Sequence, residues 1–432
     1  MKQPKRCHFL EEHNPSDQEA GAYPPGLRAR GAPLKMNCMK IKAMIVFALA
    51  IQSVSAFGEP RGEMETIVGK QWEIGVELLR RDTDHAQRVF SPYSVHSGLA
   101  LARLGAHEKT ASELDSLLFG GASADLFSAY GRLNREIQGE GSGAACSVAN
   151  SVWVSDRGEI LPSYQKAVVE SLSAEARSIT SAHPEKAIEA INSWVSSKTH
   201  SRIPNLLSPG SVDSDTSVVL VNALYFRGKW IYSFEKRDTT QEDFWLESKK
   251  SIQVPMMHGA HSLAYFESSD WQGALLPYQG ESYGFALLVP RERLSTSELA
   301  TKISPSLLRQ VVRSSQYVEV ELSMPRFSIR QRRDLAKSIA ALGVPSAFSA
   351  DANFSGISTL PALISAIVHE SFVETDEEGT EAAAATAVIM PLGAMPHEGS
   401  VKQLRADRPF VFAIVHLSSG VPMFIGIVGD PR

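Results

Sequence analysis

The sequence predicts an α+β fold in one domain, because helical patterns fill its first part and strand patterns fill most of its second part. Of the 432 residues, 43% are hydrophobic and 21% are charged, which is the balance of an ordinary globular protein with a sizeable core. No internal repeat and no low-complexity linker divides residues 57–432. We therefore expect a single domain over that range.

The helical patterns come first along the chain. Apolar residues recur at helical spacing in residues 63–81 and 94–104, which predicts two helices there. Later runs are rich in β-branched and aromatic residues, and several are too apolar on both faces for a half-exposed sheet, so we expect both of their faces to be covered. The predicted strands are residues 147–154, 217–226, 284–289, 318–324, 364–374, 410–415 and 422–428.

Residues 1–56 are predicted to be a leader outside the domain. Two lysines precede a short apolar run and a small-residue site that ends at Ala56, which is typical of a secretory signal peptide over about residues 36–56. Residues 1–35 make a poor beginning for such a peptide and indicate an over-long gene start. We therefore expect a secreted, extracellular protein, or a periplasmic one if the source is bacterial.

Charge and motif content exclude several classes of function. The formal net charge is −5, and no stretch concentrates lysine and arginine as a phosphate-binding surface requires, so nucleic acid is not an expected partner. No run after the leader approaches the length of a membrane-spanning helix, so a membrane is not expected either. The 12 histidines show no metal-binding spacing, and no nucleotide-binding motif is present, which predicts neither a metal nor a cofactor.

Two features resemble catalytic nucleophiles, and both are better explained as structure. Residues 280–284 fit the G-x-S-x-G pattern, but apolar runs on both sides predict strand, turn and strand instead of the strand and helix that a nucleophile elbow needs. Cys146, the one cysteine outside the leader, lies within a run that predicts a buried strand. The chain is therefore not predicted to be an enzyme.

The segment that follows residue 376 fits no ordinary element. Four alanines at 382–385 favour a helix, the Thr, Val and Ile of residues 386–389 favour a strand, and prolines and glycines then make a long irregular stretch. Loops of this length in compact domains are usually functional or disordered.

Short motifs recur along the whole chain in one fixed order. They are FSPYSV at 90–95, VNALYFRGKW at 221–230, VPMM at 254–257, MPRF at 324–327, LG at 342–343, FSG at 354–356, VHE at 368–370, EEGTEAAA at 377–384, DRPFVF at 407–412 and FIG at 424–426. With these motifs the chain resembles the serpin family over about residues 68–431. The resemblance implies a serpin fold of three β-sheets and eight or nine helices, with an exposed reactive-centre loop at about residues 377–403.

The resemblance also implies a mechanism. A serine peptidase attacks the loop and forms an acyl-enzyme, and the freed loop then inserts into the main sheet and traps the peptidase. A strand that enters a sheet needs one face free of charge. That face here carries Thr380, Ala382, Ala384, Thr386, Val388 and Met390, whereas the charged Glu381 falls on the other face with Ala383.

Other residues match positions with a known role in the family. Glu377 and Gly379 match the hinge before the inserting strand, where glycine tolerates large backbone changes. Trp230 matches the place where insertion begins, called the breach. The polar cluster under the main sheet, called the shutter, is matched by Ser91, Ser94, Asn222 and His369.

The family spacing from Glu377 puts the scissile bond near Gly393, within the region Leu392, Gly393, Ala394 and Met395. Leu392 or Met395 suits a chymotrypsin-like or elastase-like pocket, and the lack of lysine and arginine there disfavours trypsin-like targets. We expect a monomer that forms a covalent complex with a serine peptidase. The alternative is a non-inhibitory serpin that acts as a binding or chaperone-like protein.

Overall fold

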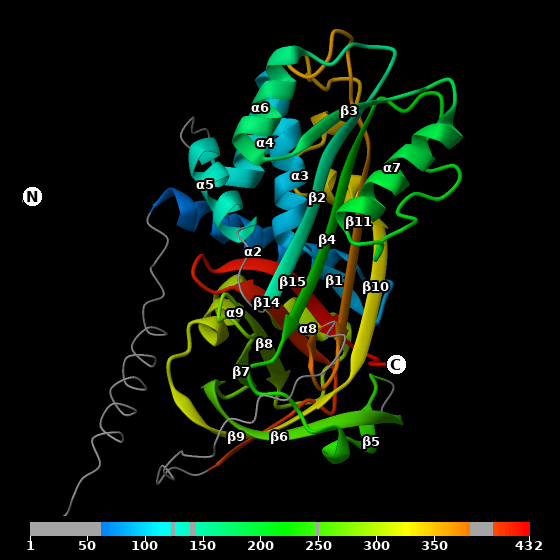
Figure 1. Cartoon of the computed structure of the whole chain (residues 1–432). Helices are drawn as coiled ribbons and strands as arrows, with labels where there is room; N and C mark the ends of the chain where they lie inside the picture. Colours follow the sequence, from blue (N-terminus) through cyan, green and yellow to red (C-terminus); the bar gives the residue numbers. More distant parts are fainter. Residues whose placement is uncertain (1–61, 122–125, 139–143, 248–249, 381–400) are drawn as a thin grey trace, which may run out of the picture. The chain divides into compact units, whose positions relative to one another are not determined.

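The computed structural model describes residues 62–121, 126–138, 144–247, 250–380 and 401–432 (Figure 1). Within these residues there are nine α-helices and two short 3-10 helices, Lys236–Asp238 and Ser346–Phe348. The helices are α2 (Glu63–Arg81), α3 (Pro92–Leu104), α4 (Glu108–Phe119), α5 (Leu126–Gln138), α6 (Pro162–Leu172), α7 (Pro184–Lys198), α8 (Thr296–Lys302), α9 (Pro305–Val312) and α10 (Ala336–Ala341).

The strands form two hydrogen-bonded sheets. The six-stranded sheet has the order β10-β11-β12-β4-β2-β3, formed by β10 (Phe327–Asp334), β11 (Ile364–Thr375), β12 (Gly379–Thr380), β4 (Val218–Lys229), β2 (Ala144–Ser155) and β3 (Glu175–Ile179). The nine-stranded sheet has the order β1-β15-β14-β8-β7-β6-β9-β13, with β5 paired to β6. Its strands are β1 (Arg88–Phe90), β5 (Thr240–Trp245), β6 (Ser251–Glu267), β7 (Trp271–Pro277), β8 (Tyr283–Pro290), β9 (Tyr317–Pro325), β13 (Lys402–Arg405), β14 (Phe410–His416) and β15 (Val421–Val428).

The long strand β6 explains why two of the three expected sheets are joined into one ladder. Its first part pairs with β5, its middle with β9, and its last residues, from Ala264 to Glu267, pair with β7. A single 17-residue strand therefore carries hydrogen bonds in both regions.

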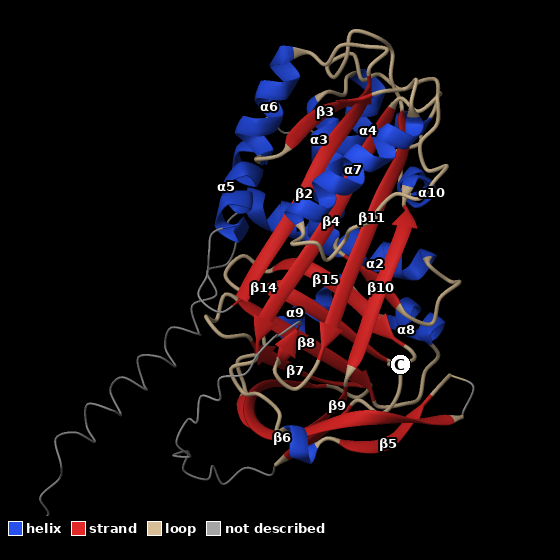
Figure 2. Ribbon diagram, turned by 45° about the vertical axis from the view of Figure 1, so that its right-hand side comes forward, coloured by secondary structure: helices blue, strands red, loops and turns tan. Residues whose placement is uncertain are grey.

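Both faces of the six-stranded sheet are covered, as its apolar strands predict. Helix α7 lies across one face, where its Ile191 and Val195 pack with Val219 and Val221 of β4 (Figure 2). The alternate residues of β4, such as Leu220 and Leu224, belong to the main core on the other face. Helix α3 lies on that second face, and Ser91 caps its first turn by accepting a hydrogen bond from the Ser94 N–H.

The structure confirms the predicted hairpin and the predicted strand around Cys146. Strands β7 and β8 pair antiparallel on either side of residues 280–282, so the G-x-S-x-G pattern lies in a turn between strands. Cys146 lies in β2, and burial raises the pKa of its thiol, which makes it a poor nucleophile.

The described part of the chain has neither a membrane-spanning helix nor a cluster of metal ligands. None of its helices has the length and apolar character needed to span a bilayer. It also contains no group of three or more histidine, cysteine, aspartate or glutamate residues placed to hold a metal ion.

Candidate functional site

The centre of the six-stranded sheet is a parallel pair of strands that separate at one end. Strands β11 and β4 pair directly from Ile364 with Val218 as far as Phe372 with Tyr225. Beyond that pair, the short strand β12 lies between them and bonds to both in antiparallel fashion. The sheet is therefore already open at this end by the width of one strand.

Thr380 occupies the opening. It pairs with Thr375 of β11 on one side and with Gly228 of β4 on the other, and it is 1% exposed. Its hydroxyl lies 2.6 Å from the hydroxyl of Tyr278, a fully buried side chain. The sequence pattern marks Thr380 as the first residue to enter the sheet, and in the structure it is buried there before any cleavage.

Trp230 fastens the backbone just before β12. Its indole N–H donates to the carbonyl of Asp376 at 2.9 Å, and its backbone N–H donates to the carbonyl of Glu378 at 2.9 Å. The ring stacks on Tyr278 with centroids 4.6 Å apart. Trp230 and Tyr278 together hold both the turn and the first inserted residue, Thr380.

Glu377 and Gly379 have distinct local roles. The buried carboxylate of Glu377 accepts hydrogen bonds from Arg326 and from the hydroxyl of Thr239. Burial raises the pKa of Glu377, but the bonds from Arg326 and Thr239 outweigh it and leave the pKa below its ordinary value. Gly379 has φ of 155°, and a Cβ there would collide with the carbonyl of Gly228, so the close approach to β4 requires glycine.

The four predicted shutter residues lie together beneath the closed part of the β11–β4 pair. His369 Nε2 accepts from the Ser91 N–H at 3.1 Å, so its Nδ1 carries the proton and donates to the side-chain oxygen Oδ1 of Asn222 at 2.8 Å. The Asn222 amide nitrogen donates to the carbonyl of Ser94. The cluster therefore links both strands to the N-terminus of α3.

Two members of this cluster were not predicted. Ser371, two residues after His369 on β11, donates its hydroxyl to His369 Nε2 at 2.9 Å. Asn150 of β2 accepts from the Asn222 amide at 2.7 Å. Neither stands out in the sequence, because other polar residues lie beside them, Ser151 next to Asn150 in β2 and Glu370 next to Ser371 in β11.

The buried His369 gives the protein a predicted dependence on pH. Burial lowers the pKa of His369 to about 3, so between its unfolded pKa of about 6.5 and 3 the unfolded chain binds a proton that the native chain does not. The free energy of unfolding should therefore fall with decreasing pH in that window, by up to about 1.4 kcal/mol per pH unit for this one site. His96, whose pKa burial lowers to about 4, acts in the same direction.

The variant His369→Gln should melt at a lower temperature than the parent at pH 7, because its hydrogen bonds are lost. Its melting temperature should then fall less steeply than the parent's between pH 6.5 and pH 4. The exposed His183 gives the matched control, His183→Gln, which should leave the slope unchanged. Equal slopes for His369→Gln and the parent would contradict the assignment of the acid sensitivity to His369.

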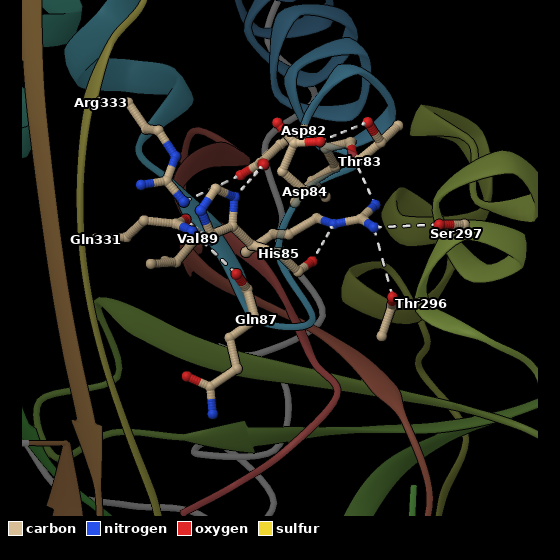
Figure 3. A network of polar contacts seen from close by, with 12 residues as sticks. Asp82, Thr83, Asp84, His85, Gln87, Val89, Thr296, Ser297, Gln331 and Arg333 are labelled. Carbon is tan, nitrogen blue, oxygen red and sulfur yellow. Dashed lines mark hydrogen bonds and ion pairs between the residues drawn. The ribbon is translucent and has the colours of Figure 1, made fainter. Parts of the chain in front are cut away.

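A polar network attaches the outer strand β10 to the helices (Figure 3). Gln331 of β10 accepts from the Val89 N–H at 2.8 Å, and Arg333 reaches Asp82 at 3.5 Å. The neighbouring Arg88 is buried and donates to the carbonyls of Leu79 and His85. The β10–β11 side of the sheet is therefore tied to α2 and to β1, the strand that leads into Ser91.

Several predicted residues lie outside the described part of the chain. These are Glu381, Ala382, Ala383, Ala384 and Thr386 of the inserting segment, and Leu392, Gly393, Ala394 and Met395 of the scissile-bond region.

Comparisons with known proteins agree with the fold. The family model described as serpin (serine protease inhibitor) matches residues 73–431. The bovine leukocyte elastase inhibitor is 34% identical over 382 residues, covering 85% of this chain and 100% of the bovine protein. The human leukocyte elastase inhibitor is 35% identical over 367 residues, covering 82% of this chain and 96% of the human protein. The crystal structure of Serpin48 from the insect Tenebrio molitor has a TM-score of 0.76 and 27% identity, covering 87% of this chain and 100% of that one, which confirms the expected serpin fold.

These relatives correct one prediction. The leader at residues 1–56 predicted an exported protein, extracellular or periplasmic. The leukocyte elastase inhibitors that match are intracellular serpins without signal peptides, so the prediction of a secreted protein is contradicted. A short apolar run after two lysines and before small residues is therefore a weak indication of export.

The prediction that the chain is not an enzyme is confirmed by its family, whose members inhibit proteases and do not catalyse a reaction of their own. The family model covers nearly the whole described chain, and the two inhibitors at 34% and 35% identity match it over almost their full length. The chain therefore belongs to the serpin family of serine protease inhibitors.

Proposed function

We propose that this serpin is a suicide-type inhibitor of serine endopeptidases that acts as a monomer and traps the acyl-enzyme by inserting its cleaved loop between β11 and β4. The observation that carries the proposal is the position of Thr380, buried between these strands at the start of the predicted inserting segment. Its side chain lies on the core face of the sheet, since its partner Thr375 shares that face with Val373.

Continuing the register of β12 supports the proposal. Antiparallel pairing from Thr380 with Thr375 and Gly228 would bring Ala382 between Val373 and Phe226. Four residues further along the loop, Thr386 would fall between His369 and Asn222, which pair with each other in the native sheet. Insertion would therefore divide the shutter cluster, and Thr386 would offer a hydroxyl to the groups that lose their partners.

The energetics favour insertion once the loop is cut. The inserted strand would form two ladders of hydrogen bonds, one with β11 and one with β4. Insertion would break the one ladder that now joins β11 directly to β4, so the net gain is about one ladder. At about 1 kcal/mol per bond, a strand of roughly ten residues gains about 10 kcal/mol before apolar burial is counted. The intact protein would then be metastable and held in its native form by kinetics.

The polar network around Arg88 and Gln331 indicates which half of the sheet moves. Strand β10 is tied to β1 by Gln331 and to the end of α2 by Arg333 (Figure 3). We infer that β10 and β11 stay with this framework while β4, β2 and β3 shift together with α7, which packs on β4 and β2.

We propose a chymotrypsin-like or elastase-like peptidase as the target. Leu392 and Met395 supply apolar residues near the expected scissile bond, and no lysine or arginine lies between Met390 and Pro396. The bovine and human relatives are named as inhibitors of leukocyte elastase, which agrees with that choice.

The test is a gel assay of complex formation. The chain incubated with chymotrypsin or leukocyte elastase should form a covalent complex that survives denaturant, and trypsin should give less of it. Mass determination of the released peptide would identify the scissile bond.

The main alternative is a non-inhibitory serpin that acts as a binding or chaperone-like protein. In that case the loop would be cut as a substrate or would never insert, and no covalent complex would form. A complex with trypsin alone would instead overturn the target assignment and leave the inhibitory mechanism intact.

A further inference from the structure

A serine, a histidine and a glutamate form a line of hydrogen bonds on the nine-stranded sheet. His258 of β6 lies directly opposite Ser323 of β9, and the His258 Nδ1 is 3.0 Å from the Ser323 Oγ. The other ring nitrogen, Nε2, is 2.8 Å from the Oε1 of Glu242 in β5. Three strands therefore bring a hydroxyl, an imidazole and a carboxylate together, and we call Ser323, His258 and Glu242 the Ser323 relay.

The ionised carboxylate of Glu242 sets the direction of both hydrogen bonds. Burial raises the pKa of Glu242, but the bonds from Arg405 and Thr240 outweigh it and leave the pKa below its ordinary value. A carboxylate can only accept, so His258 Nε2 carries the ring proton and donates a hydrogen bond to Glu242. In the neutral imidazole Nδ1 is then bare, and it accepts a hydrogen bond from the hydroxyl of Ser323. His258 is therefore in the tautomer that can take the proton of Ser323.

Further bonds hold Glu242 in place. Thr240 donates its hydroxyl to the Oε1 of Glu242 at 2.8 Å, and Arg405 of β13 donates to the Oε2. With both oxygens bound, the carboxylate keeps its orientation toward His258. Arg405 is also the residue opposite Ser323 in the pairing of β13 with β9, so its side chain lies on the same side of the sheet. A cation there can stabilise negative charge that develops on a group attacked by Ser323.

The Ser323 relay is open to solvent. The His258 side chain is 30% exposed and the Glu242 side chain is 25% exposed. Ser323 itself is half-buried. The nearest residues on the same face of β9, β13 and β6 are exposed, and they are Glu321, Gln403 and Ala260. A small reagent can therefore approach Ser323 from this face.

Two other serine–histidine contacts lack part of this arrangement. The pair of Ser371 and His369 is buried in the shutter cluster, where a reagent cannot reach it. Ser147 lies 3.3 Å from the ring of the exposed His200, but no carboxylate pairs with His200 in the described residues. The combination of exposure, a bare ring nitrogen and a fixed carboxylate therefore sets Ser323 apart from these two serines.

From this geometry we propose that Ser323 is an activated nucleophile that accepts one acyl or phosphonyl group from a donor with a good leaving group. The Ser323 Oγ forms a bond to the carbonyl carbon or the phosphorus while its proton passes to His258 Nδ1. The leaving group departs with its bonding electron pair, and His258 then gives the proton to that group or to water. Because β9 is paired on both sides, its backbone N–H groups are engaged in the sheet and form no oxyanion hole, so we expect one group per chain and no turnover.

The experiment treats the full chain alone with a fluorophosphonate and maps the modified residue by mass spectrometry. Ser323 should carry one phosphonyl group per chain, with fluoride released, and Ser323→Ala should lose that label. His258→Gln should slow the labelling of Ser323 by roughly a hundredfold, because the proton then has no acceptor. No peptidase is present, so the result does not depend on the proposed inhibitory function.

Glu242 acts through His258 and is a positioning residue, so its test needs a second readout. Glu242→Gln should slow the labelling of Ser323, but by less than His258→Gln does. Nitrogen-15 NMR of the His258 ring should show a proton on Nε2 in the parent and a mixture of the two tautomers in Glu242→Gln, because an amide can both donate and accept. The same single tautomer in both proteins would contradict this role of Glu242.

Two controls are available in the same chain. His183→Gln removes an exposed histidine that pairs with Glu185 at 3.3 Å at the start of α7, and this variant should be labelled at the parent rate. Ser262 is an exposed serine on the same face of β6 as His258, and it should stay unlabelled. Melting temperatures equal to that of the parent would show that the variants keep the fold.

Three results would overturn the proposal. They are the absence of label on Ser323 in the parent, equal labelling of Ser323 and Ser262, and an unchanged rate in His258→Gln. If His258→Gln does not fold, the parent still decides the question. Labelling of Ser323 far faster than that of Ser262 then supports an activated serine, and equal rates exclude it.

Discussion

Thr380→Arg should convert this inhibitor into a substrate. Thr380 is buried between β11 and β4, and its hydroxyl contacts the neutral hydroxyls of Tyr278 and Thr375, so a guanidinium there would be crowded and would meet no charge at that contact. Burying an unpaired charge costs several kcal/mol, which slows insertion enough for deacylation to release the peptidase. The number of inhibitor molecules consumed per peptidase trapped, measured by titration, should rise at least roughly tenfold, because 1.4 kcal/mol in a competing rate is a factor of ten.

The matched control is Glu381→Arg, one residue later and on the opposite face of the predicted strand. It keeps a charge on the solvent side and should retain most of the inhibition. Because Thr380 lies in the sheet before cleavage, Thr380→Arg should also displace β12 in the native protein, which the fluorescence of the adjacent Trp230 would report. If Thr380→Arg traps its peptidase with the same number of inhibitor molecules consumed as the parent, the inserting segment does not need a charge-free face.

The central strands could be predicted closely because their residues are apolar on both faces. The sequence predicted strands at 217–226 and 364–374, and the structure has Val218–Lys229 and Ile364–Thr375. The first helix, at residues 63–81, has the predicted bounds. The helix has one clear period of 3.6 residues, and the strands are bounded runs rich in β-branched residues, so other local structures compete little with either.

Neither β6 nor β10 was predicted as a strand, and the reason differs between the two. Strand β10 buries Phe327, Ile329 and Gln331 at alternate positions, but Arg330 and Arg332 lie on its other face and make the run too polar to stand out as a strand. Arg330 in fact pairs with Glu370 at 2.9 Å across the sheet. Strand β6 contains two histidines and a glycine in its middle, and only its pairing with β5, β7 and β9 makes it a strand.

The resemblance identified the residues of the candidate site. It did not predict that β12 already lies between β11 and β4 in the native protein. Sequence patterns can say that Thr380 belongs to the charge-free face, but they cannot say how far β12 enters the sheet. That depends on contacts between segments distant in the chain, such as Trp230 with Asp376 and Tyr278 with Thr380. The role of Tyr278 was missed for the same reason, because it lies in the turn after β7 and no local pattern connects it to residue 380.

Cutting the loop between Met390 and Met395 should raise the melting temperature of the protein. The freed segment would become a central strand worth about 10 kcal/mol, and for a domain of this size about 1 kcal/mol shifts the melting temperature by roughly 2 °C, so a rise of about 20 °C is expected. Thermal unfolding followed by circular dichroism, before and after a limited digest, measures it.

Two controls make this result specific to insertion. A cut introduced at the exposed Leu360, far along the chain from the loop, should lower the melting temperature, as most cuts in a folded domain do. The cut form of Thr380→Arg should gain less than the cut parent, because its first inserted position would bury a charge. If the parent melts at the same temperature or lower after cleavage, the loop does not insert, and the opening between β11 and β4 would be a fixed feature of the fold with room for β12 alone.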